Sequence, residues 1–120
     1  NGTLAHAERV ATRLGIMGHF DDVFDIVAAD YQPKPNAEPY PKMLARFGIE
    51  AQRTAFFEDM ARNLTPAHKL GITTILVAED GTDVNEKMNM PEQYRQHDAA
   101  HIDVTTDDLT ALLSDISAAR

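Results

Sequence analysis

Two adjacent carboxylates are the first feature of the sequence that could do chemistry. Glu58 and Asp59 follow directly on the apolar run Ala55–Phe57, and Asn63 comes shortly after them. Proteins bind Mg²⁺ through one or two carboxylates together with water and substrate phosphate. The pair therefore indicates a magnesium site with Glu58 and Asp59 as its ligands. A second interpretation stays open, in which Asp59 caps a helix that begins near Ala61 and Glu58 is solvated.

A lysine and a helix start are the other candidates, and both suit an anion. Lys34 lies between Pro33 and Pro35, which restrict the backbone on either side of it. An ammonium group held in this way can neutralise a phosphate, although an ordinary exposed loop lysine would have the same sequence. Asn1 and Gly2 precede a predicted helix, where backbone N–H groups bind anions.

Short apolar runs without polar alternation are typical of strands that are buried on both faces in a parallel sheet. These runs are Val23–Ala29, Ala55–Phe57 and Thr73–Ala78, and a weaker candidate strand lies at His101–Val104. Since ligands of such sheets bind at the carboxyl ends of the strands, the carboxylate pair is well placed. We also expect Lys34 to lie within reach of Asp59, at the same edge of the sheet.

Helices are predicted between the strands, because apolar residues recur there at the spacing of one helix face. The predicted helices are Thr3–Leu14, Tyr40–Phe47, Ala61–Leu70 and Thr106–Ala118, with Thr3 capping the first and Thr106 or Asp107 the last. The polar segment Glu79–Ala100 predicts a long surface loop with a short helical turn near Pro91–Gln96.

The alternation of helices and strands predicts an α/β fold, a Rossmann-like parallel sheet with helices on both faces. The 120 residues suffice for one domain, 1–120. The 19 acidic against 11 basic residues give a net charge of −8, which repels nucleic acids. No apolar run approaches the length of about 20 residues that a membrane span needs. The sequence has no cysteine, which excludes disulfides and suits a reducing cytoplasmic setting.

Taken in order, these motifs resemble the haloacid dehalogenase superfamily, and in particular its pyrimidine 5'-nucleotidase-like branch of phosphatases. The resemblance covers about residues 1–80. It rests on Asn1-Gly2 at a helix start, Lys34-Pro35, Phe56-Phe57-Glu58-Asp59-Met60-Ala61-Arg62-Asn63 and Leu70-Gly71-Ile72.

The resemblance implies a role for each candidate residue. Asn1 and Gly2 would follow the hydroxyl residue of the second family motif, which binds the transferring phosphoryl group. Lys34 would be the lysine of the third motif, which neutralises phosphate and nucleophile. Glu58 and Asp59 would be the Mg²⁺ ligands of the fourth motif, supported by Asn63. The implied activity is hydrolysis of a phosphomonoester, in this branch a nucleotide, through an aspartyl-phosphate.

The first family motif, Asp-x-Asp, is absent, since no aspartate is followed two positions later by another. We therefore expect the chain to be the C-terminal portion of such a phosphatase. Its nucleophile, its substrate-selecting cap and two sheet strands would lie outside these residues. The chain alone should be inactive, and a second chain or a missing segment should complete the sheet. The alternative is a non-catalytic fragment that binds a phosphorylated ligand or a protein partner.

Overall fold

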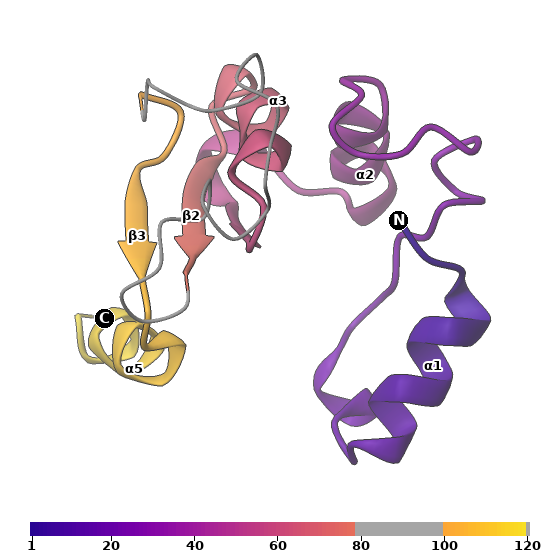
Figure 1. Ribbon diagram of the computed structural model, residues 1–120, viewed down its shortest axis with the longest axis horizontal. Coiled ribbons are helices and arrows are strands. Elements are labelled where there is room, and N and C mark those ends of the chain that lie inside the picture. The colour runs from indigo at the N-terminus through magenta and orange to yellow at the C-terminus, as the bar shows by residue number, and fades with distance from the viewer. Residues whose placement is uncertain (79–99, 120) are drawn as a thin grey trace. The chain divides into compact units, whose positions relative to one another are not determined.

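A computed structural model describes residues 1–78 and 100–119. The chain divides into two units, Asn1–Glu50 and Ala51–Arg120 (Figure 1). The predicted loop Glu79–Ala100 and its helical turn fall almost wholly outside the described residues. No helix of the described ranges is long and apolar enough to cross a membrane.

The first unit contains two helices that the sequence predicts. They are α1 (Leu4–Arg13) and α2 (Pro39–Phe47), with the short 3₁₀ turn η1 (Met17–His19) after α1. The Thr3 side chain accepts a hydrogen bond from the backbone N–H of His6 and caps α1, as predicted. Helix α2 ends at Gly48, whose φ of 64° is the left-handed conformation that glycine adopts without strain.

The predicted strand Val23–Ala29 is wrong. The chain turns there instead, with the backbone N–H of Ala29 bonded to Asp25 O at 3.0 Å and that of Tyr31 to Ile26 O at 2.8 Å. The Asp25 carboxylate accepts from the N–H groups of Ala28 and Leu4, both at 2.9 Å. An aspartate that bonds nearby backbone N–H groups favours turns over strands, and here it outweighs the apolar, branched composition.

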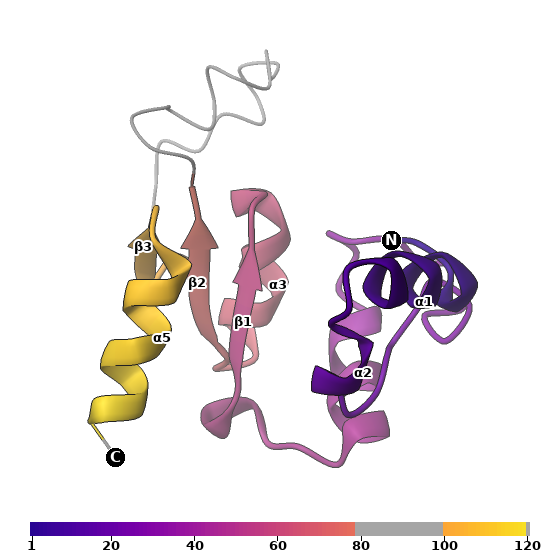
Figure 2. The same ribbon diagram turned by 90° about the horizontal axis from the view of Figure 1, so that it is seen from below.

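The second unit is built on a parallel sheet. Its strands are β1 (Ala55–Glu58), β2 (Thr73–Val77) and β3 (Val104–Thr106), in the order β1-β2-β3. Phe57 pairs with Ile75, which in turn pairs with Val104. Helices α3 (Leu64–Lys69) and α5 (Leu109–Ala118) lie on opposite faces (Figures 1 and 2). The predicted α/β class, with a parallel sheet and helices on both faces, is confirmed, as is the direct pairing of β1 with β2.

Three elements of this unit begin at residues other than those predicted. The third strand lies at Val104–Thr106 instead of His101–Val104, because its pairing with β2 sets its position. Since Thr106 belongs to that strand, α5 begins later and is capped by Asp108, whose Oδ1 accepts from Ala111 N at 2.9 Å. The helix predicted at Ala61–Leu70 begins as the 3₁₀ turn η3 (Ala61–Asn63) before α3.

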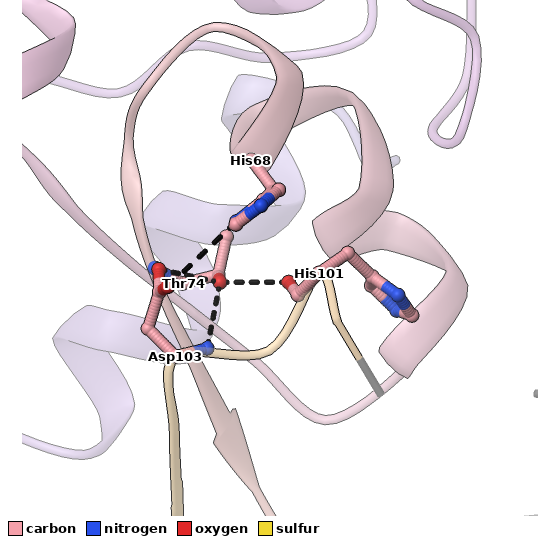
Figure 3. A network of polar contacts seen from close by, with 4 residues as sticks. All are labelled: His68, Thr74, His101 and Asp103. Atoms are coloured by element: carbon pink, nitrogen blue, oxygen red, sulfur yellow. Dashed lines mark hydrogen bonds and ion pairs between the residues drawn. The ribbon is translucent and has the colours of Figure 1, made fainter. Parts of the chain in front are cut away.

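The core of the second unit is built mainly from residues of β2 and α3 and the residues between them. Its most deeply buried side chains are Leu64, Ala67, Ile72, Thr74 and Ile75, each at most 2% exposed. Thr74 is polar, and its hydroxyl is satisfied by the residues that precede β3 (Figure 3). Thr74 Oγ1 lies 2.9 Å from Asp103 Oδ2 and 2.7 Å from His101 O, and it accepts from Asp103 N at 3.1 Å. This hydroxyl therefore fixes the start of β3 against β2.

Replacing Thr74 with valine should lower the free energy of unfolding by about 1–3 kcal/mol, since the shape is kept while buried polar groups lose their partner. Urea unfolding followed by circular dichroism would measure the change. Thr105→Val is the matched control, because Thr105 is an exposed threonine on β3. An equal loss in both variants would contradict this role of the buried hydroxyl.

A second stability prediction concerns pH and the first unit. The backbone N–H groups of Ala28 and Leu4 hold the pKa of Asp25 below its ordinary value of 3.8. A carboxylate whose pKa is lowered by folding stabilises the protein fully above its unfolded-state pKa of about 3.9, and this contribution is lost as the pH falls through the lower folded-state pKa. Asp25→Asn should therefore lower the urea midpoint at pH 7, and its difference from the unmodified protein should shrink below about pH 4.

The control for this experiment is Asp21→Asn, since Asp21 is an exposed aspartate in the same unit. We expect its urea midpoint to follow that of the unmodified protein at both pH values. A constant difference between Asp25→Asn and the unmodified protein from pH 7 to pH 3 would contradict the linkage to Asp25.

Candidate active site

The first unit brings two of the candidate phosphate-binding residues together. Asn1 and Lys34 are 33 positions apart, yet the side-chain amide of Asn1 contacts the Lys34 backbone twice. Asn1 Oδ1 accepts from Lys34 N at 2.8 Å, and Asn1 Nδ2 donates to Lys34 O at 3.3 Å. The sequence predicts both residues as candidates but not this contact.

The start of α1 and the loop before α2 are joined by further hydrogen bonds. Ile26 N donates to Gly2 O at 3.0 Å, and Leu4 N donates to Asp25 Oδ2 at 2.9 Å. At the other end of the loop, Lys42 on α2 forms an ion pair with Asp30. Asn1, Gly2 and Lys34 therefore belong to one hydrogen-bonded substructure, in which Lys34 is partly buried.

In the second unit, the carboxylate pair stands at the carboxyl end of β1, but its two members differ. Glu58 is only 8% exposed, and its Oε1 accepts from the backbone N–H groups of Asp59 at 3.2 Å and Met60 at 3.3 Å. Asp59 is exposed, and the N-cap residue of the turn η3 is Met60, which makes no side-chain cap. The interpretation with a solvated Glu58 is therefore wrong, and the N-cap position belongs to Met60 instead of Asp59.

Asn63 ends the turn that follows the pair. It is 3% exposed, and its backbone N–H donates to Met60 O at 2.9 Å. Leu64, which is fully buried, follows it at the start of α3. Glu58 and Asn63 thus fix the two ends of the turn, which leaves Asp59 as its exposed carboxylate.

The candidate residues of both units lie in the part of the chain that matches a known protein family. The family model for haloacid dehalogenase-like hydrolases matches residues 1–77, a range that runs from Asn1 to the end of β2. The chain belongs to the haloacid dehalogenase-like hydrolase family. No solved structure matches it.

The donor atoms of this haloacid dehalogenase-like hydrolase suit a magnesium ion. Carboxylate oxygens at the end of a parallel strand are hard ligands, and Mg²⁺ retains several waters when one or two carboxylates bind it. In residues 1–78 and 100–119, no group of three or more histidine, aspartate or glutamate side chains could hold a metal. A magnesium ion held by Asp59 and Glu58 would therefore take further ligands from water, from substrate or from outside these ranges.

The hydrolase also contains a polar cluster that the sequence did not reveal. His68 Nδ1 lies 3.8 Å from Asp103 Oδ1 (Figure 3). The His101 ring nitrogen Nε2 lies 3.1 Å from Ala61 O. The Thr74 backbone and hydroxyl hydrogen bonds, together with His68, hold the pKa of Asp103 below its ordinary value. Thr74 pairs with Phe56, towards the amino end of the sheet and away from Asp59, so we assign this cluster to the fold.

The candidate residues belong to different units. Asn1, Gly2 and Lys34 belong to the first, and Glu58, Asp59 and Asn63 to the second. That Lys34 reaches Asp59 stays a prediction.

Proposed function

We propose that the protein is a Mg²⁺-dependent phosphatase that hydrolyses a phosphomonoester. The substrate is a nucleotide, as in the pyrimidine 5'-nucleotidase-like branch of the family. The observation that carries the proposal is the exposed Asp59 next to the buried Glu58 at the carboxyl end of β1, in a chain of the haloacid dehalogenase-like hydrolase family. This is the edge of a parallel sheet at which ligands bind.

Phosphoryl transfer depends mainly on positioning and on neutralising charge at the phosphate. In the proposal, the Lys34 ammonium neutralises the phosphoryl oxygens, and the Gly2 backbone N–H lies at the phosphate. Asp59 and Glu58 hold the magnesium ion, and Asn63 supports their turn. When bound, Mg²⁺ supplies a positive charge that polarises the phosphate and stabilises developing negative charge.

The attacking group is proposed to be an aspartate outside these 120 residues, because the sequence contains no Asp-x-Asp pair. A carboxylate nucleophile forms an aspartyl-phosphate and so divides hydrolysis into two easier steps. The chain would then be the C-terminal portion of the enzyme and inactive alone. The same missing pair favours a second candidate function, a non-catalytic module that binds a phosphorylated ligand or a protein partner.

We further propose that the edge of β1 is covered by a second chain or by a segment outside this sequence. Within residues 1–78 and 100–119, the strand that pairs with β1 is β2, and Phe57 on β1 is 37% exposed. An open strand edge with apolar side chains favours pairing with another strand. The net charge of −8 argues against a nucleic acid polymer as partner, and the lack of cysteine supports a cytoplasmic setting.

The test is release of phosphate by the purified full-length protein that contains this chain. The substrates are p-nitrophenyl phosphate and a panel of nucleoside 5'-monophosphates, each with Mg²⁺ and with EDTA. We expect release that needs Mg²⁺ and is fastest with pyrimidine nucleotides. Binding of these nucleotides without any release would instead support the non-catalytic module.

A further inference from the structure

We propose that Asn1 is a positioning residue that holds Lys34 in place through its side-chain amide, and that this amide does not itself bind the phosphate. The inference rests on the proposed function, in which Lys34 neutralises the phosphoryl group. In this role Asn1 does not bind the phosphate but supports Lys34, the residue that neutralises it.

The geometry of the amide carries the argument. A side-chain amide offers one acceptor oxygen and one donor nitrogen. In Asn1 both are directed to the main chain of a single residue, with Oδ1 2.8 Å from Lys34 N and Nδ2 3.3 Å from Lys34 O. An amide that rotated to bind a phosphate would lose its short bond to the Lys34 N–H.

The two prolines beside Lys34 make this contact important for holding the loop. Proline has no backbone N–H, so Lys34 carries the only main-chain donor in the stretch Pro33-Lys34-Pro35. Asn1 accepts from that donor. Asn1 therefore uses the one backbone N–H group that these three residues offer.

Asn1 can serve as a support because its own segment is anchored. The next residue, Gly2, accepts from Ile26 N at 3.0 Å, and Leu4 N donates to the Asp25 carboxylate at 2.9 Å. Lys34 lies in the irregular segment between these turns and α2. The lysine side chain has a flexible four-carbon stem, so fixing its backbone narrows the region that the ammonium group can reach.

The test is a double-mutant cycle in the full-length protein, with Asn1→Ala, Lys34→Met and the double variant. The measured quantities are kcat and KM for p-nitrophenyl phosphate with Mg²⁺. We expect Asn1→Ala to lower kcat by about 10- to 100-fold, since small misplacements of a catalytic group have effects of this size. In the Lys34→Met background the same change should lower kcat less than about twofold, because coupled residues are not additive.

Two further variants sharpen the result. Asn1→Asp keeps the acceptor for the Lys34 N–H but loses the donor to Lys34 O, so its kcat should lie between those of Asn1→Ala and the unmodified protein. Asn36→Ala is the matched control, because Asn36 lies in the same loop and its side-chain amide donates to Gln32 Oε1 at 3.0 Å. We expect it to keep the kcat of the unmodified protein.

Additive losses in the double variant would overturn the inference, since Asn1 would then contribute independently of Lys34. An unchanged kcat in Asn1→Ala would overturn it as well. If the unmodified protein releases no phosphate, the proposed function fails, and hydrogen exchange at the Lys34 amide decides the structural part. Protection that Asn1→Ala removes would then support the positioning role, and equal exchange in both proteins would overturn it.

Discussion

Replacing Lys34 with methionine should lower the kcat of the full-length protein for a phosphomonoester by about 10²–10³-fold, the usual effect of removing one preorganised charge from a transition state. Methionine keeps an unbranched side chain of similar size but carries no charge. The effect on folding should be smaller, because both hydrogen bonds between the Asn1 amide and the Lys34 backbone are kept. Steady-state phosphate release and urea unfolding would measure the two quantities.

Lys69→Met is the matched control for this prediction. Lys69 is an exposed lysine in the last turn of α3, and it is not among the candidate site residues. Its loss should leave kcat unchanged. Near-normal turnover in Lys34→Met would contradict the proposed role of this lysine. This conclusion would hold whatever effect Asp59→Asn has on Mg²⁺ binding.

The second large effect is expected on the affinity for Mg²⁺. Asp59→Asn should weaken Mg²⁺ binding by about 10- to 100-fold or more, since even residues that only support metal ligands have effects of that size. Phosphate release should fall with it at limiting Mg²⁺. Because Asp59 is exposed, the substitution should be tolerated by the fold. Calorimetric titration with Mg²⁺ and the Mg²⁺ dependence of phosphate release would measure both changes.

Two comparisons give this experiment its controls. Asp107→Asn removes an exposed aspartate from the same unit and should leave Mg²⁺ affinity unchanged. Asn63→Ala should weaken Mg²⁺ binding less than Asp59→Asn, because Asn63 supports the turn and is not proposed as a ligand. Unchanged Mg²⁺ affinity and unchanged phosphate release in Asp59→Asn would show that the assignment of this motif is wrong.

The elements that the sequence predicts well are those with strong local signals. Helix α1 has Thr3 as its cap, and α2 ends at a glycine in the left-handed conformation. Strands β1 and β2 are apolar runs on either side of a helix, which suits neighbours in a parallel sheet. In each case the residues that determine the element lie within it or next to it.

The predictions are wrong or incomplete where a polar side chain or a residue distant in the sequence determines the local structure. The run Val23–Ala29 is apolar enough for a strand, but the Asp25 carboxylate bonds Leu4 N and Ala28 N and holds a turn. The position of β3 depends on its register with β2. The same is true of the site. Its residue types are readable in the sequence, whereas the contact of Asn1 with Lys34 and the burial of Glu58 depend on segments far apart or on the path of a single turn.

The way in which β3 is fastened to β2 bears on the register of the sheet. Thr74 bonds Asp103 at one end of the strand pair, and Ala78 N donates to Thr106 O at 2.9 Å at the other. The pairing is thus held by hydrogen bonds at both ends of the strand pair. A slip of β3 by one residue would break these bonds and would turn each side chain of the strand to the opposite face of the sheet. The two bonds therefore oppose such a slip and keep the side chains of β3 on the faces where they now lie.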